Sequence, residues 1–223
     1  MSFYEQLLRD TASDREQILK APALLRGIQG DIPRSAYLAF LIEAYHHVRH
    51  TVPLLMACGA RLPARLEWLR EAVAEYIDEE TGHQEWILND IRAAGGDAET
   101  VRTGQPYATT ELMVAYVYDG IARGNPASFF GMVLVLEGTS VALATQAAGR
   151  IQKTLDLPDT AFSYLSSHGS LDQEHIRFYE KLMDRLDDAD DRAAVTHAAR
   201  MFYRLYGDIF RSLPLDDQQR DAA

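Results

Sequence analysis

Apolar residues recur every three or four positions through most of this 223-residue chain. That spacing places them on one face of an α-helix, whereas a half-buried strand needs strict alternation of apolar and polar residues. Alternating runs that end in tight-turn signals do not occur. The pattern therefore predicts an all-α helical bundle. A chain of this length can bury a sizeable core without splitting, so we expect a single domain over residues 1–223.

Helix signals divide the bundle into seven elements. Ser13 with Glu16 has the spacing of a capping box, and Pro53 is expected to kink the second helix. The clearest breaks are Gly95-Gly96 and the segment 157–159. The predicted helices lie at residues 14–28, 34–57, 64–93, 110–123, 126–155, 160–187 and 190–211.

Composition excludes several classes of function. The net charge is −11, and no Lys/Arg-rich block is present to bind a phosphate backbone, so we expect no nucleic-acid partner. No stretch approaches the roughly 20 apolar residues of a membrane span, and the N-terminus lacks signal-peptide features, so we expect a cytoplasmic protein without a membrane partner. Cys58 is the single cysteine, which excludes thiolate clusters. Any metal must be bound through nitrogen and oxygen.

Ionisable residues occupy positions where the helical pattern predicts the core. In the third predicted helix, Glu80 and His83 continue an apolar stripe that includes Leu69, Val73, Tyr76, Ile87 and Ile91. In the sixth, three successive inward positions are His168, Asp172 and His175. These residue types at this spacing indicate metal-ligand chemistry.

Two further helices carry inward carboxylates. Glu137 lies in a nearly apolar run, and no Lys or Arg occurs between Arg123 and Arg150. Glu43 shares a face of the second helix with His47 and His50. A single buried histidine is more often a satisfied core residue, and a single buried glutamate is more often paired with arginine. The conjunction favours metal binding, because E-x-x-H, the isolated Glu137 and H-x-x-x-D-x-x-H fall on three core-facing stripes at once. A metal cation would also offset the cost of burying Glu137.

Three histidines and at least three carboxylates exceed the four ligands of one zinc and match the donors of two first-row metals in a helical bundle. Iron is the leading candidate, and manganese remains an alternative. The bare pattern fits two architectures. A ferritin-like four-helix bundle would use Glu43, Glu80, His83, Glu137, Asp172 and His175. The second architecture also uses His168.

Three motifs carry a resemblance to a known family. They are the segment 79–90 (EETGHQEWILND), the isolated Glu137, and the segment 168–175 (HGSLDQEH). Together with the segment 45–55, they resemble the haem-oxygenase-like di-iron oxidases over about residues 34–185.

The resemblance implies a haem-oxygenase-like seven-helix bundle that binds two irons per chain and no haem. Glu80, His83 and His168 would bind mainly one iron, and Glu137, Asp172 and His175 mainly the other. Glu80, Glu137 and Asp172 would also take part in catalysis. Glu43, His47 and His50 would either add a ligand or support the ligands from behind.

The implied function is the oxidation by dioxygen of a small, partly apolar substrate. A fatty acid or an amino acid would suit, through oxidative decarboxylation or C–C or C–N oxidation, and we expect a homodimer. The same fold hosts thiaminase II, which would require Cys58 as nucleophile, and the cofactorless pyrroloquinoline-quinone synthase. A cofactorless oxidase and a non-catalytic iron-binding protein therefore stay open as alternatives.

Overall fold

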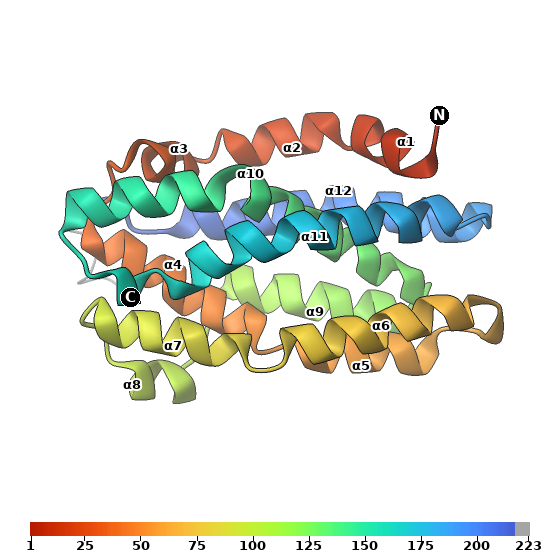
Figure 1. The fold of residues 1–223 in the computed structure, drawn as a ribbon, viewed down its shortest axis with the longest axis horizontal. Coiled ribbons are helices and arrows are strands. Elements are labelled where there is room, and N and C mark those ends of the chain that lie inside the picture. Colours follow the sequence, from red (N-terminus) through yellow and green to blue (C-terminus); the bar gives the residue numbers. More distant parts are fainter. Residues whose placement is uncertain (217–223) are drawn as a thin grey trace.

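A computed structural model describes residues 1–216, apart from the side chains of residues 141–146 and 168–174. Over residues 1–216 the chain is helical and contains no strand, as the periodicity predicts (Figure 1). The α-helices are α1 (Phe3–Asp10), α2 (Ala12–Leu19), α3 (Pro22–Gln29), α4 (Arg34–Val48), α5 (Thr51–Arg61), α6 (Glu67–Glu80), α7 (His83–Ala93), α8 (Ala98–Thr103), α9 (Ala108–Arg123), α10 (Phe129–Leu155), α11 (Ser163–Arg185) and α12 (Ala189–Ser212). Short 3₁₀ turns, η1 (Ala64–Leu66), η2 (Pro126–Ser128) and η3 (Asp159–Ala161), precede α6, α10 and α11.

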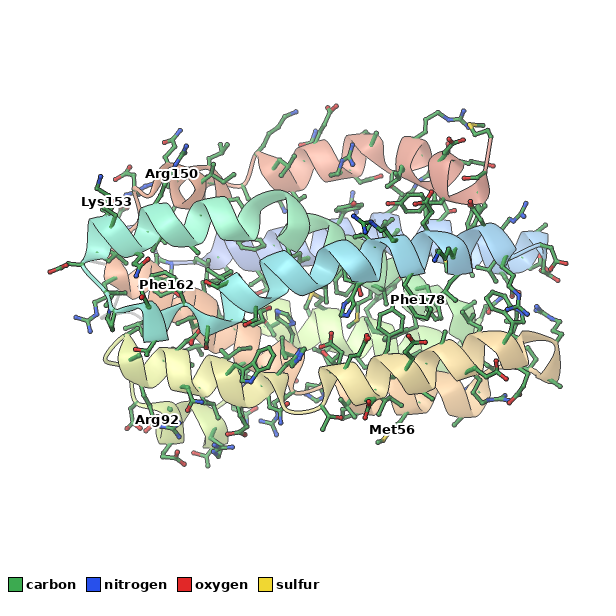
Figure 2. The ribbon with its side chains drawn as sticks, in the orientation of Figure 1. Met56, Arg92, Arg150, Lys153, Phe162 and Phe178 are labelled. Atoms are coloured by element: carbon green, nitrogen blue, oxygen red, sulfur yellow. The ribbon has the colours of Figure 1, made fainter. Side chains whose placement is uncertain are left out.

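The long helix α10 forms the centre of the packing. It contacts α11 and α12 most extensively and also packs against α3. On the opposite side of the bundle, α4 packs on α7 and α5 packs on α6 (Figure 1). Cationic side chains such as Arg92, Arg150 and Lys153 point away from the bundle, whereas Phe178 points inward (Figure 2). None of the described helices is both long and apolar enough to cross a membrane.

The buried apolar side chains form two clusters. The larger core cluster includes Leu69 and Tyr76 of α6 and Leu54 of α5. The smaller core cluster includes Leu41 of α4 and Ile87 of α7. Helices α10 and α11 contribute to both clusters. We call the region where the helices pass from one cluster to the other the junction.

The predicted helix at 34–57 is interrupted at the junction. Helix α4 ends at Val48 and α5 begins at Thr51, so the break precedes the proline that was expected to cause a kink. Pro53 lies in the first turn of α5, where its missing N–H has no intrahelical partner to lose. The expected kink is therefore a complete helix end.

The predicted helix at 64–93 is also divided at the junction. Helix α6 ends at Glu80, and Gly82 has a φ of +97°, a left-handed conformation that favours glycine. Helix α7 then starts at His83. A glycine inside a helical pattern is often tolerated, so periodicity alone missed this break.

The N-terminal segment differs from the prediction in two places. The predicted helix at 14–28 is two helices, because Pro22 starts α3 as its first residue. The capping box is formed by Ser2 and Glu5 at the start of α1, and the expected box at Ser13 and Glu16 does not begin a helix, since α2 begins at Ala12.

Close packing of α10 on α12 depends on Gly131. A Cβ atom at this position would lie 2.5 Å from the backbone nitrogen of Ala199 and 2.8 Å from the Cβ atom of Ala198. At Gly149, farther along α10, no described atom beyond the adjoining backbone of the same helix lies within 4 Å of such a Cβ position. The two glycines therefore offer a matched test of helix packing.

We expect Gly131→Ala to lower the free energy of unfolding by about 1–3 kcal/mol, because the added methyl group overpacks the α10–α12 contact. Gly149→Ala should leave stability unchanged or raise it by up to about 1 kcal/mol, through helix propensity alone. Chemical denaturation followed by circular dichroism measures both. Equal stabilities of the two variants would contradict the close approach of α10 and α12.

Candidate functional site

Two of the predicted ligands meet where α6 ends and α7 begins. The Nδ1 atom of His83 lies 3.0 Å from the Oε2 atom of Glu80, and their side chains are 4% and 13% exposed. The His83 ring also stacks on Trp86, with ring centroids 4.1 Å apart. The turn at Gly82 thus keeps Glu80 and His83 together although they belong to different helices.

A second pair joins α10 to α11. The Nδ1 atom of His175 lies 3.7 Å from the Oε1 atom of Glu137. Its Nε2 atom lies 3.0 Å from the Oε2 atom of Glu79, so His175 stands between two carboxylates. Glu79 was not among the predicted site residues. It is 41% exposed, and its position beside Glu80 places it off the apolar stripe, so the pattern gave no signal for it.

The side chains of His168 and Asp172 lie outside the described residues. Their helix, α11, also carries His175. Their roles as metal ligands, and the catalytic role of Asp172, stay predictions from sequence spacing and from the family resemblance.

Glu43 is engaged elsewhere. It is 1% exposed, and its two carboxylate oxygens accept from the backbone N–H of Tyr107 at 3.2 and 3.0 Å. Tyr107 is the N-cap of α9 and provides no side-chain cap of its own. Burial raises the pKa of Glu43, against the opposing effect of its hydrogen bonds. Glu43 therefore acts as a buried acceptor at the N-terminus of α9.

The two histidines near Glu43 have different surroundings. His47 is 4% exposed, and its ring meets that of Tyr206 edge-on, with the ring centroids 5.9 Å apart. The Nδ1 atom of His50 lies 3.2 Å from the hydroxyl of Tyr118. Burial, followed by the charge of Arg49, lowers the pKa of His50. His47 belongs to the cavity described below, whereas His50 faces α9.

A further buried carboxylate, Asp90 of α7, positions α11. Its Oδ2 atom accepts from the backbone N–H of Tyr164 at 2.9 Å, and its Oδ1 atom accepts from that of Ser163 at 3.1 Å. These two N–H groups lie at the N-terminus of α11, where the helix itself offers them no acceptor. Asp90 thereby fixes the helix that carries His175.

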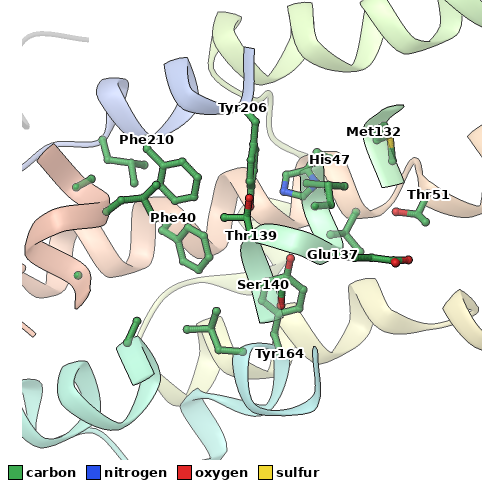
Figure 3. Close-up of a pocket in the computed structure, with 18 of the residues that line it drawn as sticks. Phe40, His47, Thr51, Met132, Glu137, Thr139, Ser140, Tyr164, Tyr206 and Phe210 are labelled. Atoms are coloured by element: carbon green, nitrogen blue, oxygen red, sulfur yellow. The ribbon is translucent and has the colours of Figure 1, made fainter. Parts of the chain in front are cut away.

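An apolar cavity of about 150 Å³ adjoins the Glu–His pairs, and we call it the central cavity. Glu80, Glu137 and His47 line it, and most of the remaining wall is aliphatic or aromatic. In Figure 3, Phe40 and Phe210 lie at one end and Glu137 lies at the other. The described lining residues include no Lys or Arg. The cavity therefore combines an apolar body with an acidic end.

Cys58 does not belong to this site. Its side chain is fully buried, and its Sγ atom lies 3.4 Å from the carbonyl oxygen of Pro126. Burial raises the pKa of the thiol to about 12, so at neutral pH it is protonated. A nucleophilic role for Cys58, as in thiaminase II, is not supported because the thiolate is the reactive form.

Solved structures with similar folds define the structural class. A domain of unknown function with a haem-oxygenase-like fold from Shewanella denitrificans has a TM-score of 0.83 at 24% identity, over 94% of this chain and 91% of its own. A TenA homologue from Pseudomonas syringae has a TM-score of 0.77 at 11% identity, over 95% and 91%. Haem oxygenase-1 from Synechocystis, in complex with haem, has a TM-score of 0.75 at 12% identity, over 96% and 92%. The fold is thus haem-oxygenase-like and not the alternative ferritin-like four-helix bundle.

The family follows from the sequence profile. The profile described as iron-containing redox enzyme, of the haem-oxygenase-like group, matches residues 38–207. The chain therefore belongs to the family of haem-oxygenase-like iron-containing redox enzymes. No curated protein matches it significantly.

The expected cofactor set has to be corrected. We expected two irons per chain and no haem, but haem oxygenases from Synechocystis with this fold are solved in complex with haem. The fold therefore does not exclude haem. In addition, the side chains described here contain no group of three or more His, Cys, Asp or Glu placed to hold a metal ion. Glu43, expected as a possible extra ligand, instead accepts from the backbone N–H of Tyr107.

We expect Glu43→Gln to fold and to gain stability relative to the wild type as pH rises from about 5 to about 8. A raised pKa means that the folded state retains a proton that the unfolded state releases, so the wild type loses stability above the ordinary pKa of 4.5. The amide cannot titrate and keeps an acceptor oxygen for Tyr107.

Urea denaturation of both proteins across this pH range measures the difference. Glu43→Ala is the control. It should lower the free energy of unfolding by about 1–3 kcal/mol, because the N–H of Tyr107 loses its acceptor. A stability difference between Glu43→Gln and wild type that is independent of pH would refute this interpretation of Glu43.

Proposed function

We propose that this protein is an iron-dependent oxidase or oxygenase that uses dioxygen to oxidise a small, partly apolar substrate in the central cavity. One observation carries the proposal. Glu80 and Glu137, each beside a buried histidine, line the same apolar cavity. The description of the family, which names iron and redox chemistry, supports it.

The donor set at the junction suits iron. The pair of Glu80 and His83 and the pair of Glu137 and His175 would provide part of the donor set, because carboxylate and imidazole donors together suit iron in both its common oxidation states. Burying carboxylates costs free energy unless positive charge offsets the cost. An iron cation would provide that charge where the described lining of the cavity has no Lys or Arg. His168 and Asp172 are proposed as further ligands from their spacing in the sequence.

Bound iron would supply the activation of dioxygen, and the chain would supply binding, orientation and exclusion of water. The aromatic end at Phe40 and Phe210 would hold the apolar part of the substrate, with the oxidised group directed toward Glu80 and Glu137. A volume of about 150 Å³ limits the substrate to a small molecule. A short fatty acid or an amino acid with an apolar side chain fits this description.

We expect the purified protein to bind iron and to consume dioxygen with a suitable substrate. His83→Ala and Glu137→Gln should weaken iron binding by about tenfold or more and abolish oxygen consumption, because the first removes a nitrogen donor and the second replaces a charged oxygen donor with a neutral one. His197→Ala is the matched control, since His197 is an exposed residue of α12. Iron is measured by chelator competition, oxygen by an electrode, and helicity by circular dichroism.

Each alternative function has a distinct outcome in these assays. Unchanged iron affinity in both His83→Ala and Glu137→Gln would place the metal elsewhere and contradict the proposal. An absorbance band typical of bound haem, formed on titration with haemin, would favour haem chemistry. Oxygen consumption by iron-free protein would favour a cofactorless oxidase, and iron binding without oxygen consumption would favour a non-catalytic iron-binding protein.

A further inference from the structure

Tyr76 of α6 carries a buried hydroxyl group in the wall of the central cavity. The residue is 2% exposed and lines the cavity together with Glu80 and Glu137. Within the part of the chain that the structure describes, its hydroxyl has no hydrogen-bond partner. A buried hydroxyl that loses water without gaining a partner is costly, so such groups call for an explanation.

Other buried tyrosines of the core show the usual arrangement. The hydroxyl of Tyr179 donates to the carbonyl oxygen of Phe130 at 2.8 Å, and that of Tyr37 donates to the carbonyl oxygen of Ala161 at 2.6 Å. Tyr37 lines the cavity as well, but its hydroxyl is already used. Tyr76 therefore differs from Tyr37 and Tyr179 in keeping its donor available.

The ring of Tyr76 is held in place by its neighbours. It meets the ring of His175 edge-on, with the ring centroids 5.8 Å apart, and it packs at a tilt against the ring of Phe178, with the centroids 5.5 Å apart. A phenol has an ordinary pKa of about 10 and therefore carries its proton at neutral pH. A fixed, protonated phenol is a hydrogen-bond donor with a defined position.

We propose that the Tyr76 hydroxyl donates a hydrogen bond to an oxygen acceptor on the molecule bound in the central cavity, and so orients it. The ligand class is a small molecule with an apolar body and a hydroxyl, carbonyl or carboxylate oxygen at one end. The apolar body packs toward Phe40 and Phe210, and the oxygen lies at the end lined by Tyr76 and Glu137. The inference rests on the proposed function only in taking this cavity as the substrate site.

The first test needs no ligand and compares Tyr76→Phe with Tyr179→Phe. Removing a hydroxyl that has no partner among the described side chains should leave the melting temperature within about 1 °C of wild type or raise it. Removing the hydroxyl of Tyr179 breaks a buried hydrogen bond and should lower the melting temperature by about 2–4 °C. An equal loss in both variants would overturn the proposal, because it would show that Tyr76 has a structural partner.

The second test measures binding of benzyl alcohol and ethylbenzene, two probes of similar shape of which only the alcohol has an oxygen acceptor. A cavity of about 150 Å³ is large enough for a single aromatic ring. Tyr76→Phe should lower the affinity for benzyl alcohol by about three- to tenfold and leave the affinity for ethylbenzene unchanged. Tyr179→Phe should retain the wild-type preference for the alcohol.

The outcomes separate this inference from the proposed function. An unchanged preference for benzyl alcohol in Tyr76→Phe, or no binding of either probe to wild type, would overturn the role of Tyr76. Neither binding measurement requires iron, so a failure of the iron assays leaves the test of Tyr76 intact. Iron affinity of Tyr76→Phe should equal that of wild type, since its phenol is proposed to contact the substrate and not the metal.

Discussion

The structure depends on burying carboxylates and imidazoles between two apolar clusters. Each cluster alone resembles an ordinary helical core, but Glu80, His83, Glu137 and His175 are buried or nearly so at the junction. Burial of so many ionisable groups is costly unless they are paired or bind a cation. The Glu–His pairs reduce that cost in the protein itself, and a bound cation would reduce it further.

Two helix breaks lie beside these buried groups, at the junction. At the turn at Gly82, the last residue of α6 and the first of α7 still lie side by side, as residues three positions apart also do on a continuous helix. The break between α4 and α5 also falls at the junction. Buried acceptors complete the arrangement, because Glu43 and Asp90 hold the N-termini of α9 and α11. Carboxylates thus serve two purposes here, as helix acceptors and as the acidic end of the cavity.

Much of this arrangement could be predicted from the sequence. Helical periodicity identified the class of fold, and the inward stripes identified Glu80, His83, Glu137 and His175 as residues of one region. Local patterns could not show that Glu43 is committed to Tyr107, because that partner lies 64 positions away. They also could not assign Glu79, or show that the Tyr76 hydroxyl lacks a hydrogen-bond partner among the described residues, since both depend on how α6 packs against α10 and α11. The prediction of two irons and no haem went beyond the motif. The motif indicates the types of donor atom, but it does not determine the number of metal ions and does not exclude haem.

The most direct test of iron at the junction is a crystal structure of the iron-loaded protein with anomalous diffraction recorded at the iron absorption edge. We expect an anomalous peak at the acidic end of the central cavity, within bonding distance of side chains from Glu80, His83, Glu137 or His175. A peak at another place in the molecule, no peak at all, or a haem ring in the cavity would contradict iron bound by these residues.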